Sequence, residues 1–397
     1  MPVDLLRPFA VAALLTCLGA PAAMAEDLSI RLAGTIETVF DYTEEACEPL
    51  DVPDGPARAF RDADGTIRLI ATHYVNRAFV GPDLDALRHD CTVIYRGGNQ
   101  DDPAAYDDRA WLMSPYTLDG SRVFALVHNE YHGHHRRGLC ASGSYRGCWE
   151  NAVTWAVSTD GGRSFNGPGP ERRAIAMPPW RYEGDRGRPV GLFNPSNIVA
   201  KDGFYYTLVF TRPWGAQKGG VCLLRTDRLE DPEAWRAWDG EGFTVRFADP
   251  YREPAADPDG HVCAPVGAGL LTGSVTSLVR HEPSGLFIAL QAALRPPEPG
   301  AEPVSGVYAA VSRDLVQWSW PTLVWEVPTW GHFSCPAQQW SIGYPSLLDP
   351  SSPSRNFETV ADEAYLYFTR YNLDGCAIGR DRDLARVRVR LTGGGAE

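Results

Sequence analysis

Residues 111–131 read W-L-M-S-P-Y-T-L-D-G-S-R-V-F-A-L-V-H-N-E-Y, with an apolar segment on each side of an Asp-Gly pair. Asp-Gly is favoured in the tight turn of a β-hairpin, because glycine adopts a positive φ without steric strain. The second segment, 123–127, is rich in β-branched and aromatic residues and runs into a polar, aromatic end. The stretch therefore predicts two antiparallel strands joined by a tight turn.

Four further segments repeat this pattern of a strand, a Gly-containing turn and a strongly apolar strand. They begin near Arg58, Asn194, Thr276 and Tyr344. Third strands that end in S/T-x-D follow in residues 151–165, 220–235 and 306–319. Five such units predict an all-β fold, a five-bladed β-propeller. The segments near Ile30 and Val387 are expected to pair and close the ring, which removes open sheet edges. The alternative is a β-sandwich with an additional domain.

The composition agrees with a turn-rich β-protein. The chain has 397 residues, of which 44% are hydrophobic, and it contains 39 Gly, 32 Pro, 12 Trp, 16 Tyr and 15 Phe. That length is sufficient for a large core. No convincing linker divides the chain, so residues 26–397 are expected to form one domain.

The N-terminus reads as a secretory signal peptide over residues 1–25. Arg7 is followed by an apolar segment that is too short to span a bilayer, and Ala23-Met24-Ala25 is a typical cleavage site. The expected location is therefore secreted or periplasmic, with no later membrane span. The net charge of −13 and the scattered arginines argue against a nucleic-acid partner.

Eight cysteines remain after the predicted cleavage site, and an even number in an exported chain indicates disulfides. Cys140 and Cys148 are the expected local pair, because they would close the loop C-A-S-G-S-Y-R-G-C. The other pairings do not follow from the sequence.

Three stretches carry a resemblance to a known class of enzyme: P-S-L-L-D (345–349), A-Y-L-Y-F-T-R (364–370) and V-Y-A-A-V-S-R-D-L-V-Q-W (307–318). They resemble the five-bladed propeller glycosidases of families 43, 62 and 32, and the likeness extends over essentially the mature chain. In addition, S-T-D-G-G-R-S-F (158–165) is similar to the Asp-box of sialidases. In that motif Asp160 is expected to bind its own turn while the two glycines adopt positive φ.

The resemblance implies acidic residues on the first strands of the first, third and fourth blades. This sequence offers Asp54, or Arg58 in place of an acid, in the first unit. It has Asn194 where an aspartate would be usual in the third unit, and the fourth unit, L-T-G-S-V-T-S (271–277), has no glutamate. The catalytic acids would then come from other positions, or the chemistry differs.

Glycoside hydrolysis requires two carboxylates, and Glu130 and Asp54 are the predicted pair. Glu130 ends an apolar strand, where desolvation is expected to raise its pKa toward that of a general acid. Polar and aromatic residues at equivalent strand ends are predicted to bind substrate: Arg58, His73, Trp111, His128, Asn194, Arg212, Trp214, Tyr344 and Arg370. The alternative for this set is a hydrogen-bond network that plugs the central channel.

Arginines at these strand ends, Arg58, Arg77, Arg212 and Arg370, could bind the carboxylate or sulfate of an acidic sugar. The alternative is that they form salt bridges between blades, which the many acidic residues of the chain favour.

The histidine-rich run L-V-H-N-E-Y-H-G-H-H (126–135) does not match the H-E-x-x-H helix of zinc proteases. On a strand, side chains alternate, so His128, Glu130 and His132 would share one side. A divalent metal ion held by His73, His128 and His132 is the alternative to a substrate pocket.

These observations favour a secreted glycoside hydrolase that acts on an oligo- or polysaccharide, with an acidic sugar as one option and without a cofactor. The alternatives are a non-catalytic carbohydrate-binding propeller and a metal-dependent lyase or hydrolase built on the histidines.

Overall fold

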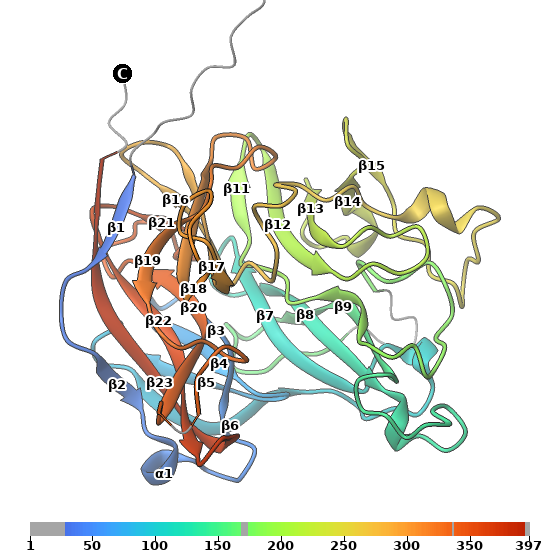
Figure 1. The fold of residues 1–397 in the computed structure, drawn as a ribbon, viewed down its shortest axis with the longest axis horizontal. Helices are drawn as coiled ribbons and strands as arrows, with labels where there is room; N and C mark the ends of the chain where they lie inside the picture. Colours follow the sequence, from blue (N-terminus) through green and yellow to red (C-terminus); the bar gives the residue numbers. More distant parts are fainter. Residues whose placement is uncertain (1–27, 168–173, 336, 394–397) are drawn as a thin grey trace, which may run out of the picture.

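The structure is a computed structural model that describes residues 28–167, 174–335 and 337–393. Within these ranges nearly all regular structure is β-strand, arranged in four hydrogen-bonded sheets (Figure 1). The prediction of an all-β fold is confirmed. The predicted signal peptide lies outside the described residues. Among the described residues, no helix combines the length and the apolar character that crossing a membrane would require.

The first sheet is a meander of four antiparallel strands: β3 (Pro53–Arg61), β4 (Ile67–Thr72), β5 (Val75–Gly81) and β6 (Arg88–Arg96). Its first turn has the predicted chemistry. The Oδ1 atom of Asp62 accepts the backbone N–H groups of Asp64 and Thr66, both at 3.0 Å, and Gly65 adopts a φ of 83°. This local pattern fixes the hairpin where the sequence predicts it.

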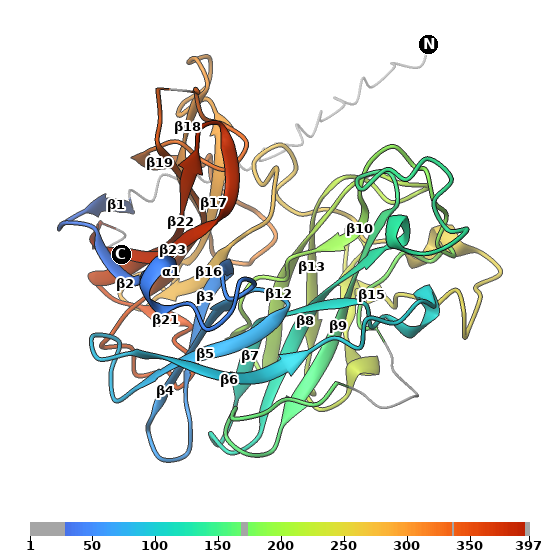
Figure 2. The ribbon, with the colours of Figure 1, turned by 90° about the horizontal axis from the view of Figure 1, so that it is seen from below.

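The second sheet has nine strands and holds two consecutive units of the chain. The first unit is β7 (Arg109–Thr117), β8 (Val123–His132) and β9 (Trp149–Ser158). The second is β10 (Val190–Phe193), β11 (Val199–Lys201), β12 (Phe204–Thr211), β13 (Gly220–Thr226), β14 (Arg236–Trp238) and β15 (Phe243–Val245). A short parallel pairing of β9 with β10 joins the two units. Figure 2 shows these strands grouped together, apart from the C-terminal strands.

The remaining two sheets come from the C-terminal part of the chain. One contains β16 (Ser277–His281), β17 (Phe287–Arg295), β18 (Val304–Ser312), β19 (Thr322–Glu326) and β21 (Thr359–Val360). The other contains β20 (Trp340–Leu348), β22 (Glu363–Asp374), β23 (Ala377–Thr392), β1 (Ser29–Leu32) and β2 (Glu37–Phe40). The short helical elements are α1 (Tyr42–Glu45) and the 3-10 turns η1 (Pro103–Ala105), η2 (Gly133–His135), η3 (Pro232–Ala234) and η4 (Pro258–His261).

The two ends of the described chain meet in one sheet. Strands β1 and β2 both pair with β23, with Ile30 opposite Leu391 and Thr38 opposite Ala385 (Figure 1). The predicted pairing of the N-terminal and C-terminal segments is therefore present.

Hydrogen bonds that involve buried side chains link neighbouring units of the chain. These hydrogen bonds run from Arg58 Nε to Met113 O (3.0 Å), from Leu112 N to Asn76 Oδ1 (2.8 Å), from Leu278 N to Asn197 Oδ1 (2.7 Å) and from Thr276 Oγ1 to Pro345 O (2.6 Å). Because buried polar groups require partners, these contacts order the inner strands.

Apolar clusters fill the space between neighbouring sheets. One cluster packs Phe60 and Ile70 of the first sheet against Leu112 and Val127 of the next unit. All four side chains are almost completely buried. Each such side chain stabilises the fold by about 1.5–3 kcal/mol when it leaves water.

Four disulfides are present: Cys47–Cys91, Cys140–Cys148, Cys222–Cys263 and Cys335–Cys376. They use all eight predicted cysteines. The predicted local pair, Cys140–Cys148, is confirmed, whereas the other three join cysteines 41 to 44 positions apart.

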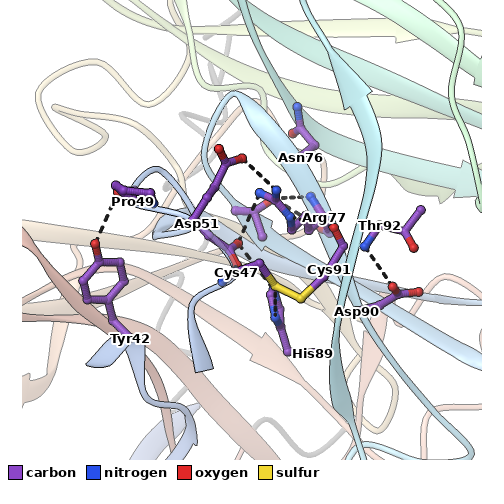
Figure 3. Close-up of polar contacts among 12 residues, drawn as sticks. Tyr42, Cys47, Pro49, Asp51, Asn76, Arg77, His89, Asp90, Cys91 and Thr92 are labelled. Atoms are coloured by element: carbon purple, nitrogen blue, oxygen red, sulfur yellow. Dashed lines mark hydrogen bonds and ion pairs between the residues drawn. A yellow bond between two sulfur atoms is a disulfide. The ribbon is translucent and has the colours of Figure 1, made fainter. Parts of the chain in front are cut away.

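The Cys47–Cys91 disulfide adjoins a buried ionic network (Figure 3). The Asp51 carboxylate accepts the backbone N–H of Cys47 at 2.9 Å and lies 3.3 Å from Nε2 of His89 and 3.6 Å from Nη1 of Arg77. Burial would raise the pKa of Asp51, but these partners lower it. The network anchors the segment before β3.

The turn after β9 has the geometry expected of residues 158–165. The Asp160 carboxylate accepts the backbone N–H groups of Arg163 and Ser164, both at 3.0 Å, and Gly161 and Gly162 adopt φ values of 73° and 83°. Its relationship to the sialidase Asp-box stays a prediction.

Candidate functional site

The histidine-rich end of β8 forms a buried three-residue cluster. Because side chains alternate along a strand, His128, Glu130 and His132 point to the same side. The Nε2 atom of His128 lies 3.0 Å from one carboxylate oxygen of Glu130, and the Nε2 atom of His132 lies 2.8 Å from the other. Both oxygens of Glu130 are thus engaged by imidazoles.

This arrangement contradicts the expectation that desolvation makes Glu130 a general acid. Burial alone would raise the pKa of Glu130, but the hydrogen bonds and charges of His128 and His132 lower it to about 2. Hydrogen bonds to the charged form of a carboxylate favour that form. Glu130 is therefore ionised at neutral pH.

The surroundings of the two histidines define their roles. Nδ1 of His128 accepts the backbone N–H of Asn194 at 3.3 Å, so its proton lies on Nε2 and is donated to Glu130. The ring of His132 lies 5.2 Å from that of Tyr145 and 5.4 Å from that of Trp149, and the latter two are 5.2 Å apart, so the three rings form one cluster. These contacts hold both imidazoles against the carboxylate.

Asp54, the second predicted carboxylate, lies on β3. Its Oδ1 atom accepts a hydrogen bond from Nη1 of Arg382 at 2.6 Å, and the Tyr344 hydroxyl lies 3.4 Å from the same atom. Its Oδ2 atom lies 3.4 Å from Nε2 of His73. The side chain of Asp54 retains 18% of its exposure, so a ligand can reach it.

Glu130 and Asp54 act on the same neighbours. Burial raises the pKa of Tyr344 well above its usual value, and the charges of both Asp54 and Glu130 add to this effect. Burial lowers the pKa of His73, and the same two charges oppose that shift. Asp54 lies 3.4 Å from His73, and Glu130 lies 3.0 Å from His128.

Trp111 connects the two halves of this region. Its ring lies 5.4 Å from that of His73 and 5.7 Å from that of His128. Trp111 is 5% exposed, so little of its ring is open to solvent. It therefore forms a wall of the site.

Two strained backbone positions also border the region. Asn194 and Tyr344 each precede a proline and have φ values of 44° and 56°, which a non-glycine residue rarely adopts. The Asn194 side chain donates to Ser274 Oγ at 3.1 Å, and its backbone N–H reaches His128. Such strain is common at functional sites.

The remaining predicted binding residues lie further out or play other roles. Arg58 is 4% exposed, and its Nη2 atom has no hydrogen-bond partner among the described residues. Burial lowers its pKa to about 9. The guanidinium of Arg212 lies over the ring of Phe193, 5.8 Å from its centroid. Trp214 lies 5.3 Å from the guanidinium of Arg186, beside a buried ion pair of that arginine.

Two of the four strand-end arginines form ion pairs, but neither pair joins two sheets, whereas the alternative expected salt bridges between blades. Arg370 binds Asp383 at 2.6 Å, and Arg77 binds Glu48 at 2.7 Å. Arg370 also contacts Thr38, so the structure does not bring it to Glu130 or Asp54.

The sequence analysis missed four residues of the site. Arg382 comes from β23, and only tertiary structure brings it to Asp54. Tyr145 lies in the Cys140–Cys148 loop and Trp149 directly follows it, and no pattern in the sequence linked these aromatic residues to Glu130. The Arg109 charge acts on His73 and Tyr145.

The histidines do not form the alternative metal site. Among the described residues, two groups bring His, Cys, Asp or Glu ligand atoms within 4.8 Å of one another, namely Cys47, His89 and Cys91, and Cys140, Cys148 and Asp185. Neither group contains His73, His128 or His132, and the cysteines of both are disulfides. His128 and His132 instead bind opposite oxygens of Glu130.

A cavity of about 360 Å³ lies elsewhere, lined by residues such as Met177, Trp235 and Phe247. We place the candidate site at Glu130 and Asp54, because buried titratable groups converge there and such convergence is typical of functional sites.

Comparison with solved structures places this geometry on a known fold. Sucrose-6-phosphate hydrolase from Lactobacillus gasseri aligns with 89% of this chain and 64% of its own at a TM-score of 0.51 and 12% identity. An α-L-arabinofuranosidase from Lactobacillus brevis aligns over 88% and 94% of the two chains (TM-score 0.48, 11% identity). The α-L-arabinanase of Cellvibrio cellulosa aligns over 85% and 91% (TM-score 0.45, 13% identity).

No protein-family model matches the sequence, and no curated protein matches it. The chain has the β-propeller fold of glycoside hydrolases, so the resemblance predicted from the sequence is confirmed for the fold. At identities this low, structural similarity indicates a common fold, and the activity has to be inferred from the residues of the site.

Proposed function

We propose that the protein is an exported glycoside hydrolase with Glu130 and Asp54 as its paired carboxylates. The observation that supports this most directly is that Trp111 contacts both His73, beside Asp54, and His128, beside Glu130, although the two carboxylates come from different sheets. Two carboxylates on one pocket are the requirement of most glycosidases.

The proposed architecture is a single five-bladed propeller over residues 26–397. The nine-stranded sheet would be two blades joined by the short β9–β10 pairing, and the other three sheets one blade each. The pairing of β1 and β2 with β23 would close the ring. The side-chain hydrogen bonds that join the first unit to the second, the third to the fourth and the fourth to the fifth support this order.

The roles of the carboxylates are assigned from their partners. Glu130, held ionised by His128 and His132, is suited to act as a base toward water or as a nucleophile toward the sugar. Asp54 is the second carboxylate of the pair, and His73, which lies 3.4 Å from it, is the neighbouring group that can carry a proton. The role given to Glu130 differs from the general acid that the sequence suggested.

The remaining groups would bind the sugar. Tyr145 is 47% exposed and stacks on His132, so it offers a ring face to a pyranose or furanose. Asn194 and Tyr344 supply polar groups at the same pocket, while Trp111 forms its wall.

A second candidate function is carbohydrate binding without cleavage. The observation that favours it is that both carboxylates already have strong partners: two imidazoles on Glu130, and Arg382 on Asp54. Such pairing also suits a rigid binding surface.

The test is a hydrolysis screen of the purified protein against a broad glycan panel, read by product chromatography. We expect Glu130→Gln and Asp54→Asn each to lower the rate on the cleaved glycan on the order of 10²–10⁴-fold. The matched control is Glu363→Gln, which changes an exposed glutamate paired with Arg390 on the surface. Binding of glycans without cleavage by the wild-type protein would support the second function instead.

Export is proposed on the four disulfides, because they persist in oxidising compartments. Fractionation of the native host, with the protein in the medium or periplasm, is the expected result.

A further inference from the structure

Two backbone contacts bring three chain segments together beside the candidate site. The N–H of Arg186 donates to the carbonyl of Gly147 at 2.8 Å, which joins the Cys140–Cys148 loop to the segment before β10. Nη2 of Arg188 donates to the carbonyl of Pro213 at 2.9 Å, which joins that segment to the end of β12. Arg146 precedes Gly147 at the first contact, and Arg188 and Arg212 lie at the second.

The arginines at these junctions are Arg146, Arg188 and Arg212, here called the arginine rim. Burial lowers the pKa of Arg212, and the positive charges of Arg146 and Arg188 lower it further. Among the described residues, none of the three takes part in an ion pair with a carboxylate.

The arginine rim lies beside the surroundings of His128 and His132. The guanidinium of Arg212 lies over Phe193, whose ring is 6.3 Å from that of His128. Arg146 directly follows Tyr145, whose ring stacks on His132 at an interplanar angle of 11°. The rim therefore lies next to the residues that hold Glu130.

Like charges held close together repel one another, and an anionic ligand would relieve this repulsion. Guanidinium groups bind carboxylates and sulfates through paired, charge-assisted hydrogen bonds. The Cys140–Cys148 disulfide fixes the loop that carries Arg146, so this part of the rim is positioned before a ligand arrives.

We propose that the arginine rim is a subsite for an anionic sugar substituent, so that the glycan taken by this pocket carries a carboxylate or a sulfate ester. The inference rests on the proposed carbohydrate pocket and names its substrate class. Arg58, Arg77 and Arg370, which the sequence also suggested for an acidic sugar, are not part of this subsite.

The experiment measures binding by calorimetry with the Glu130→Gln protein, so that cleavage does not interfere. One pair of probes is trigalacturonate and its methyl ester, and a second pair is a chondroitin sulfate hexasaccharide and its desulfated form. We expect one anionic probe to bind at least tenfold more tightly than its neutral partner. The first pair reports a carboxylate preference, and the second pair reports a sulfate preference.

Arg212→Ala and the double variant Arg146→Ala/Arg188→Ala should remove this tenfold preference and change binding of the neutral probe less than twofold. The matched control is Arg390→Ala, which removes the same charge from an exposed position on β23. Thermal unfolding of each variant verifies that the fold is retained. Equal binding within both pairs, no binding of either anionic probe, or a preference that survives the rim variants would overturn the proposal.

The outcomes also separate this inference from the hydrolase proposal. If the wild-type protein cleaves no glycan but keeps the anionic preference, the subsite stands and the hydrolase proposal fails. If it cleaves neutral glycans and shows no preference, the hydrolase proposal stands and the subsite fails.

Discussion

Nη1 of Arg382 on β23 donates to Oδ1 of Asp54 on β3 at 2.6 Å, across 328 positions of the sequence. This contact joins the first sheet of the chain to the last at the proposed active site. Asp54 therefore depends on a strand that is completed only near the C-terminus.

Replacing Arg382 with Ala should disturb Asp54 more than it disturbs the fold as a whole. A hydrogen bond to a charged group contributes about 1.5–3 kcal/mol, so the free energy of unfolding should fall by that amount. The rate of glycan cleavage should fall at least tenfold, because Asp54 loses its orientation. Arg382→Lys, which keeps the charge, should recover part of the rate. Full activity of Arg382→Ala would contradict the role given to Asp54.

Glu130 should make the stability of the protein depend on acid pH. Its pKa is about 2 in the folded state, against a usual value of 4.5. A lowered pKa contributes stability above the unfolded value that is lost as pH falls from about 4.5 toward 2, and the two values correspond to roughly 3 kcal/mol. Denaturant unfolding at pH 7, 4 and 3 measures this loss. Glu130→Gln should flatten the curve, and an unchanged slope would contradict the assignment.

Removing the Cys140–Cys148 disulfide should weaken ligand binding as well as stability. Opening a loop of this length lowers the free energy of unfolding by roughly 2–3 kcal/mol. Because Tyr145 and Arg146 lie within the loop, glycan affinity should also fall at least fivefold in Cys140→Ser/Cys148→Ser. The comparison is Cys222→Ser/Cys263→Ser, which should lower stability and leave the affinity of the folded protein unchanged.

Asp51 should matter for the fold and not for the chemistry. It is 1% exposed and holds His89 and Arg77 (Figure 3). Breaking such a buried ionic network costs about 3–5 kcal/mol, because the partner charges stay buried. Asp51→Asn should therefore lower the midpoint of thermal unfolding by several degrees, while the folded fraction retains its rate of cleavage. A specific loss of rate at full stability would contradict this separation.

The sequence predicted those parts of the structure that depend on neighbouring residues. The hairpin turn at Asp62–Gly65 and the shared side of His128, Glu130 and His132 follow from local turn chemistry and strand alternation. The Cys140–Cys148 pair was predictable because the loop between them is short.

The features that the sequence did not predict depend on contacts between distant segments. The strand-end position of Glu130 indicated burial, but the sign of its pKa shift depends on where two imidazole nitrogens point. Arg212 and Arg370 occupy similar positions in their repeats. Arg212 lies over Phe193 and forms no ion pair among the described residues, whereas Arg370 forms an ion pair with Asp383 on the next strand. Repeat position alone does not distinguish them.

The pairing of β1 and β2 with β23 has a consequence for the order of folding. Among the described strands, β1 and β2 are synthesised first and their partner β23 last. Until β23 is made, β1 and β2 present unpaired backbone groups, so the sheet that holds them cannot form earlier. Synthesis of β23 thus times the folding of this sheet.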